Sequence, residues 1–224
     1  MMSFLKLAIS RRSARSFKLR NIPEQDIYYL LDAARWAPSA NNLQNWRFIV
    51  VREMAHKKRL VSAAYDQVWL KQAPLLIVVC SLTKKIERQF PKTGKKLAMQ
   101  STSAAIQNVL LAAEDKRLAA CWVAISSEKK IRTIFEIPED VEVHGIIAIG
   151  YPLKREIAPP RINLSDLVFF EEWDSQEVDY AKDLIGPTSQ PLLENKHVKN
   201  LREKADNFKA KANDVRKKLQ IKKK

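Results

Sequence analysis

Three arginines and a serine stand together near the start of the chain, in the run Arg11-Arg12-Ser13-Ala14-Arg15. A guanidinium group donates two parallel hydrogen bonds that match the oxygens of a phosphate, and the serine hydroxyl adds a further donor. The spacing therefore suits a doubly charged phosphate group. Short basic clusters are also common on solvated surfaces, so this interpretation depends on what the rest of the sequence adds.

The sequence excludes several other kinds of chemistry. Its few glycines cannot form the glycine-rich loops that bind dinucleotides or nucleoside triphosphates. There are only four of them: Gly94, Gly145, Gly150 and Gly186. The three histidines form no local metal motif, and the two cysteines, Cys80 and Cys121, form no C-x-x-C pair. Each cysteine lies in an apolar run, which indicates a buried, reduced thiol rather than a metal ligand or a disulfide.

The elements that would position the arginines can be predicted from the apolar pattern. A short helix is expected from Met1 to about Ser16, ending in the basic cluster. Proline at position 23 is expected to open the next helix at its first position, and proline at position 38 is expected to stop it. Further helices are expected over Lys57–Tyr65, Leu97–Lys116 and Glu128–Phe135, the last of them capped by Ser127.

Four short apolar runs are expected to form strands: Phe48–Val51, Leu75–Cys80, Ala120–Ile125 and Gly145–Ile149. The run LLIVVC has no polar residue, which is typical of a strand buried on both faces. The helix over 97–116 is apolar or small almost all round, which predicts burial in a core or an interface. Because helices and strands alternate, the sequence favours an α/β or α+β sheet covered by helices.

In this order, the blocks resemble the FMN-dependent nitroreductase family. The marks are R-R-S-x-R-x-F at Arg11–Phe17, W-A-P-S-A-x-N-x-Q-x-W-R-F at Trp36–Phe48, the strand run Cys121-Trp122-Val123, and G-Y-P at Gly150–Pro152. The resemblance extends from about Ile9 to Asp166. It implies an α+β fold with a mixed, mainly antiparallel sheet flanked by helices. It also implies an intertwined homodimer that holds FMN at the subunit interface.

The resemblance also implies FMN-binding roles for particular residues. Arg11, Arg12 and Ser13 match positions that hold the phosphate and ribityl chain, and Arg15 matches the cation near N1 and O2 of the flavin. The remaining matches are Pro38, Ser39 and Ala40 in a loop reaching the partner's flavin, Asn42 and Gln44 in the same block, Val123 and Ala124 along one flavin face, and Gly150 and Arg161 on the phosphate side. The chain departs from the family pattern where Arg117, Ala119 and Ala124 replace glycine, and where Asn45 replaces proline.

The activity implied by the resemblance is hydride transfer from NADH or NADPH to the flavin N5 atom. A nitro compound, a quinone or a similar acceptor would then be reduced in a ping-pong cycle. A cation such as Arg15 would stabilise the negative charge that reduction places on the N1–C2=O region. No protein nucleophile is required, which agrees with the absence of a catalytic triad. A specialised flavin-using relative with another substrate is the alternative.

The end of the chain departs from this pattern. We predict a domain over residues 1–186, a linker over 187–194 and a basic amphipathic tail over 195–224. Twelve Lys or Arg residues against three acidic residues give the tail +9 of the net charge of +15. Apolar residues spaced by three and four allow a helix packed on its own domain, a short coiled coil, or a basic helix on nucleic acid or another anionic surface. Without a signal peptide or membrane span, a cytoplasmic protein is expected.

Overall fold

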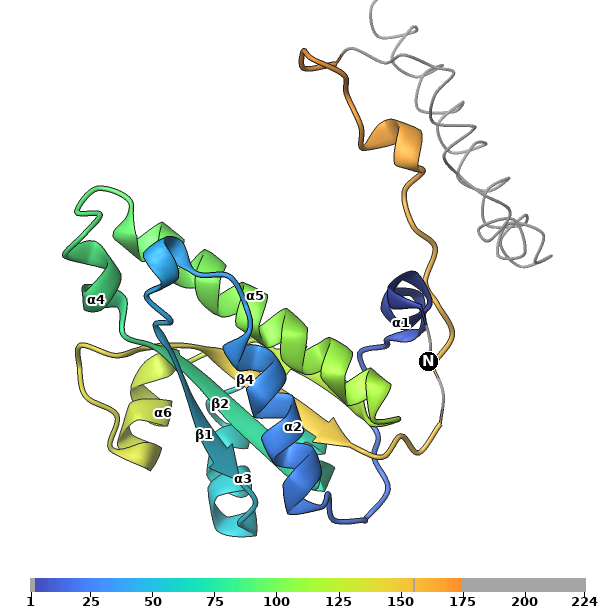
Figure 1. Ribbon diagram of the computed structural model, residues 1–224. Coiled ribbons are helices and arrows are strands. Elements are labelled where there is room, and N and C mark those ends of the chain that lie inside the picture. The colour runs from blue at the N-terminus through green and yellow to red at the C-terminus, as the bar shows by residue number, and fades with distance from the viewer. Residues whose placement is uncertain (1–2, 155, 175–224) are drawn as a thin grey trace, which may run out of the picture. The chain divides into compact units, whose positions relative to one another are not determined.

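The computed structural model of the chain describes residues 3–154 and 156–174 (Figure 1). The chain divides into two compact units, Met1–Ala158 and Pro159–Lys224. The first unit contains the sheet and its helices, whereas the described part of the second contains a 3₁₀ turn, Leu164–Asp166. The predicted linker over 187–194 and the basic tail over 195–224 lie outside the described residues.

Four strands form one sheet in the order β1-β2-β4-β3. Their bounds are β1 Trp46–Val51, β2 Leu75–Ser81, β3 Ala119–Val123 and β4 Glu142–Gly150. The paired strands are all antiparallel, and the parallel pairing seen in the described residues is a single bridge between Ser13 and Ala120. Every residue of β2 is buried, as its unbroken apolar run predicts. The fold is therefore α+β with a mainly antiparallel sheet.

Helices cover both faces of this sheet (Figure 1). Helices α2 (Glu24–Arg35) and α5 (Gly94–Asp115) pack on one face, and α3 (Met54–Val61) and α6 (Glu128–Phe135) pack on the other. Short elements complete the described chain: α1 Phe4–Ser10, α4 Thr83–Glu87, and 3₁₀ turns at Ala40–Asn42 and Val68–Gln72. The two-sided cover explains why the central strands carry no polar face.

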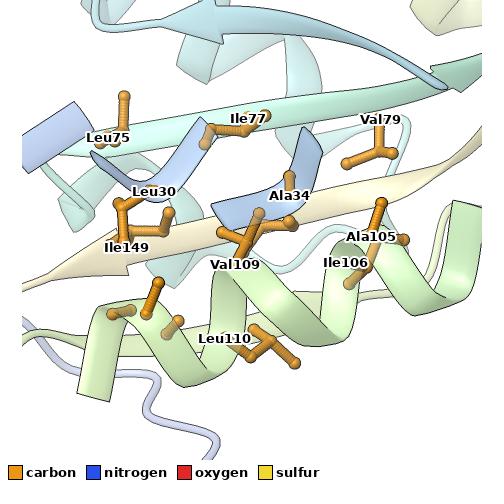
Figure 2. Close-up of a cluster of buried hydrophobic side chains, with 14 of the residues drawn as sticks. Leu30, Ala34, Leu75, Ile77, Val79, Ala105, Ile106, Val109, Leu110 and Ile149 are labelled. Atoms are coloured by element: carbon orange, nitrogen blue, oxygen red, sulfur yellow. The ribbon is translucent and has the colours of Figure 1, made fainter. Parts of the chain in front are cut away.

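The core on the α2 and α5 side is built from alternate strand residues and one stripe of each helix (Figure 2). Leu30 of α2, Ile77 of β2 and Val109 of α5 are fully buried within it. Burying side chains of this size contributes roughly 1.5–3 kcal/mol each. Helix α5 buries only one side, because Met99 on its other side is 52% exposed and Gln107 is also exposed. The prediction that α5 is buried thus holds for one face of the helix within a single chain.

Most predicted elements are present, and the differences have local causes. The Ser127 side chain accepts a hydrogen bond from the Lys130 N–H, which confirms the predicted cap of α6. Pro23 is the N-cap residue of α2 rather than its first helical residue. The prediction of a helix continuing to Ser16 is wrong, because α1 ends at Ser10 and the chain then becomes extended. That extended segment carries the arginines.

Candidate functional site

The basic segment is fixed at the sheet edge by backbone hydrogen bonds from residues distant in sequence. The Ala14 N–H donates to the Ala120 carbonyl of β3 (3.3 Å), and the Leu153 N–H, after β4, donates to the Ser16 carbonyl (3.2 Å). Ala14 is buried, whereas Ser13 and Arg15 on either side are exposed. This alternation is expected of an extended chain lying on a sheet. The segment therefore presents its polar side chains from a fixed backbone.

Arg11 and Arg15 both lie close to Cys121, the middle residue of β3. Burial raises the pKa of the Cys121 thiol, and the nearby Arg15 and Arg11 guanidinium groups oppose that shift. The two cations are thus close to a buried residue of β3, two positions before Val123. Val123 is 3% exposed, and Ala124, just beyond the strand, is exposed. The structure brings these four predicted residues into one region.

Gly150 packs tightly at the end of β4 rather than facing open space. A Cβ atom there would lie 2.6 Å from Pro74 Cδ and 2.8 Å from Phe17 Cδ1. Phe17 ends the basic segment, so this close contact holds the segment against the sheet. The family resemblance implied a phosphate-side contact for Gly150, and no sequence pattern predicted this packing role. Arg161 is exposed and belongs to the second unit, which the structure describes separately.

The second predicted group, from Pro38 to Gln44, forms a strained loop. Asn41, Asn42 and Gln44 have φ angles of 45°, 53° and 46°. Asparagine tolerates this left-handed conformation, but glutamine adopts it only at an energetic cost, so the surroundings must hold the loop in place. The Ser39 hydroxyl accepts from the Gln44 N–H (3.0 Å), and the Gln44 amide donates to the Asn42 carbonyl (3.1 Å). The loop is thus a preformed array of polar groups.

Asn45 anchors this loop to α5 from beneath. Its side chain is fully buried, and its Nδ2 donates to the Ala98 carbonyl and to Thr102 Oγ1, both at 3.1 Å. Ser101 of the same helix accepts from the Ala40 N–H at 3.2 Å. In the sequence, Asn45 was distinguished only by standing where the family commonly has proline. Its anchoring role depends on a helix more than fifty residues away, which no local pattern reveals.

The two groups lie at opposite ends of α5. The loop contacts Ser101 in the first half of the helix, whereas Arg12 shares a cavity with Glu114 at the helix end. At a rise of about 1.5 Å per residue, Ser101 and Glu114 are roughly 20 Å apart along the axis. One chain therefore assembles the arginines with β3 but keeps its own loop away from them.

The cavity beside Arg12 has a volume of about 600 Å³ and a charged lining. Three segments contribute cations to its lining: Arg12, Arg117 and Lys154. The lining also includes the carboxylates of Glu114, Asp115 and Glu156. Arg12 Nη1 donates to the Ile9 and Arg11 carbonyls, both at 2.6 Å, which orients its guanidinium group. Cations of this kind bind phosphate, and carboxylates accept hydrogen bonds from sugar hydroxyls.

A half-buried histidine lies at an irregular point of the sheet. The β2–β4 register shifts between Val79 and Cys80, and His144 lies in this part of β4. Its Nε2 is 2.9 Å from Ser81 Oγ, which is in turn hydrogen-bonded to Thr83 at 2.7 Å. Burial lowers the pKa of His144 and Lys95 acts in the same direction, whereas the nearby carboxylates oppose the shift. The folded protein thus favours the neutral ring.

This histidine predicts a loss of stability in mild acid. As the pH falls below about 6.5, the unfolded chain gains a proton at position 144 that the folded chain resists. We expect the urea midpoint to fall between about pH 7 and pH 5, and the His144→Gln variant to lose less of it. The matched control is His56→Gln, at a partly exposed position. An equal pH dependence in both variants would contradict the prediction.

Within residues 3–154 and 156–174, no three His, Cys, Asp or Glu side chains are grouped so that they could hold a metal ion. No helix in that part of the chain has the length and apolar character needed to cross a membrane.

Comparisons with known proteins agree with this architecture. The family described as "Nitroreductase family" matches residues 8–72 and 62–151. A protein of Archaeoglobus fulgidus named "Putative NADH dehydrogenase/NAD(P)H nitroreductase" is 34% identical over 176 residues, covering 75% of this chain and 98% of its own. A nitroreductase family protein from Clostridium difficile 630 superposes with a TM-score of 0.68 at 32% identity, covering 76% and 99%. An FMN-dependent nitroreductase from Clostridium difficile R20291 gives 0.67 at 26% identity, covering 76% and 100%.

Proposed function

This chain belongs to the nitroreductase family, and we propose from that membership and from its basic site that it is an FMN-dependent oxidoreductase using NADH or NADPH. The observation that carries the proposal is the fixed basic segment. Arg11, Ser13 and Arg15 are held beside β3 by backbone bonds, and the charges of the two arginines reach Cys121 within that strand. One relative is named an NAD(P)H nitroreductase and another an FMN reductase, and these names support the choice of reductant and cofactor.

The donor set of this region fits FMN. Arg11, Arg12 and Ser13 offer charge-assisted and hydroxyl hydrogen bonds to a phosphate and a sugar-like chain. Arg15 adds a fixed cation close to Cys121 of β3, two positions before Val123. When bound, FMN supplies an atom that accepts and donates hydride, which no side chain of the protein can do.

The chain's own residues bind, orient and stabilise charge. Arg15 is exposed, and backbone hydrogen bonds at Ala14 and Ser16 fix the chain on either side of it. Its charge is therefore already in place, and little reorganisation is needed during the reaction. The phosphate-binding arginines set the distance between the ligand and β3. The buried thiol of Cys121 keeps its proton, because burial raises its pKa, and it takes no part as a nucleophile.

We further propose that the active form is a homodimer with a site at each interface. The strained loop over 38–44 lies at the end of α5 remote from the arginines, so a second chain would be needed to bring such a loop to each basic site. The exposed apolar side chains of α1 support an interface: Phe4 is 72% exposed and Leu5 is 58% exposed. Met99 offers further apolar surface on α5.

The substrates that best fit this proposal are small oxidants such as nitro compounds and quinones, reduced in a ping-pong cycle after the nicotinamide product has left. We place this activity in the cytoplasm, where both nicotinamide reductants occur. The alternative to this activity is a specialised flavin-dependent reaction on another substrate. A relative named iodotyrosine deiodinase supports that alternative.

The absorption spectrum of the purified protein tests this proposal. We expect flavin bands that bleach when NADH or NADPH is added without oxygen, and that return when a quinone or a nitro compound follows. Light scattering coupled to size exclusion should give twice the chain mass of 25.8 kDa. A colourless protein that takes up no added FMN would refute the proposal.

The Arg15→Ala variant is expected to keep its fold and its FMN but to reduce that FMN slowly. Loss of one preorganised charge-stabilising group lowers such rates by about 100- to 1,000-fold. Stopped-flow absorbance under anaerobic conditions measures the rate. Lys18→Ala, which removes an exposed cation just after the basic segment, should reduce FMN at the wild-type rate. A normal rate in Arg15→Ala at full FMN occupancy would remove Arg15 from the mechanism.

A further inference from the structure

Arg117 occupies a position at the end of α5 where glycine is usual. The Leu118 N–H donates to the Ala113 carbonyl (2.8 Å) and the Arg117 N–H donates to the Glu114 carbonyl (2.9 Å). These two bonds define the helix ending in which the residue after the cap is left-handed, and Arg117 has φ 56°. A side chain at this φ costs free energy that glycine would not.

Strain alone does not single out Arg117. Glu136, at the end of α6, is also left-handed (φ 54°), so this glycine-poor chain accepts such residues elsewhere. What distinguishes Arg117 is its place in the cavity that also contains Arg12 and Lys154. Residues with strained backbone conformations cluster at binding and active sites, where the strain serves function.

The charges of this cavity leave Arg117 available for a ligand. Lys154 forms an ion pair with Glu156 (3.7 Å), and Asp115 accepts a hydrogen bond from the Tyr29 hydroxyl (2.8 Å). In the part of the chain that the structure describes, the exposed Arg117 guanidinium makes no ion pair or hydrogen bond. Glu114, half-buried in the last turn of α5, and Asp115 also line the cavity, so a ligand must compete with two carboxylates for the guanidinium groups.

We propose that Arg117 and Arg12 together bind a phosphate monoester in this cavity, with Arg117 as the residue specific to this chain. The inference rests on the proposed function, which supplies two such groups: the 5′-phosphate of FMN and the 2′-phosphate of NADPH. Both are dianionic near neutral pH and match paired guanidinium groups. Arg12 and Arg117 come from separate segments, and the fold brings both to the lining of one cavity.

The test compares Arg117→Gly with the matched control Glu136→Gly. Both substitutions place glycine where the backbone is left-handed and so remove the strain of a side chain there. Both variants should therefore melt at or above the wild-type temperature. Only Arg117→Gly should weaken phosphate binding, by about tenfold or more, as loss of a charge-assisted pair implies. Arg117→Lys, which keeps the charge, should retain part of the affinity.

Two arms identify the source of the phosphate. If it belongs to FMN, Arg117→Gly raises the dissociation constant of FMN and leaves that of riboflavin unchanged. If it belongs to NADPH, the variant raises the KM for NADPH and leaves the KM for NADH unchanged. A yellow, NADPH-reducible Arg117→Gly protein with unchanged constants in both arms would overturn the inference and leave the proposed function standing.

Discussion

The Arg12→Glu variant is expected to be purified with little or no FMN, its dissociation constant rising by roughly 100-fold or more. The substitution replaces a cation with an anion beside the proposed phosphate position. The cavity already contains Glu114, Asp115 and Glu156, so the added carboxylate meets further like charge. The ratio of flavin to protein absorbance and a fluorescence titration with FMN measure the effect.

Control variants must separate the effect of charge on FMN binding from an effect on folding, because Arg12 also donates to the Ile9 and Arg11 carbonyls. Arg12→Gln removes the charge without reversing it and should give an intermediate affinity. Arg59→Glu makes the same change of net charge at an exposed position of α3 and should keep FMN fully bound. If Arg12→Glu folds normally and retains FMN as Arg59→Glu does, Arg12 has no role at the phosphate.

The Gly150→Val variant is expected to lose about 3 kcal/mol or more of folding free energy, and so to be expressed largely as insoluble protein. The added Cβ would lie 2.6 Å from Pro74 Cδ and 2.8 Å from Phe17 Cδ1. The proline ring is rigid and Phe17 is only 5% exposed, so neither can move aside easily. Urea unfolding of Gly150→Ala, the milder change, provides a measurable value if the valine variant does not fold.

A second substitution distinguishes this clash from a general intolerance of β4. Phe17→Leu shortens one of the two side chains that meet position 150, so combined with Gly150→Ala it should recover part of the lost stability. Independent sites would show additive losses instead. Simple additivity in this pair, or wild-type stability in Gly150→Val, would show that Gly150 is not held by this contact.

Local sequence was enough for the elements whose causes are local. The run LLIVVC had to be a strand buried on both faces, because it has no polar residue to face water. Ser127 had to cap α6, because its hydroxyl reaches an N–H three residues away without help from the rest of the fold. The order of the motifs also identified the family, which the comparisons confirm.

Only the tertiary structure decided how the site is assembled. The arginines were predicted to end a helix, yet their segment is extended, because β3 and the chain after β4 offer it backbone partners. Asn45, Gly150 and Arg117 gained their roles in the same way, through α5, Phe17 and the Arg12 cavity. Each role depends on groups far apart in sequence that packing brings within a few ångströms. Periodicity reports which residues are buried, but it carries no information about which distant partner each of them meets.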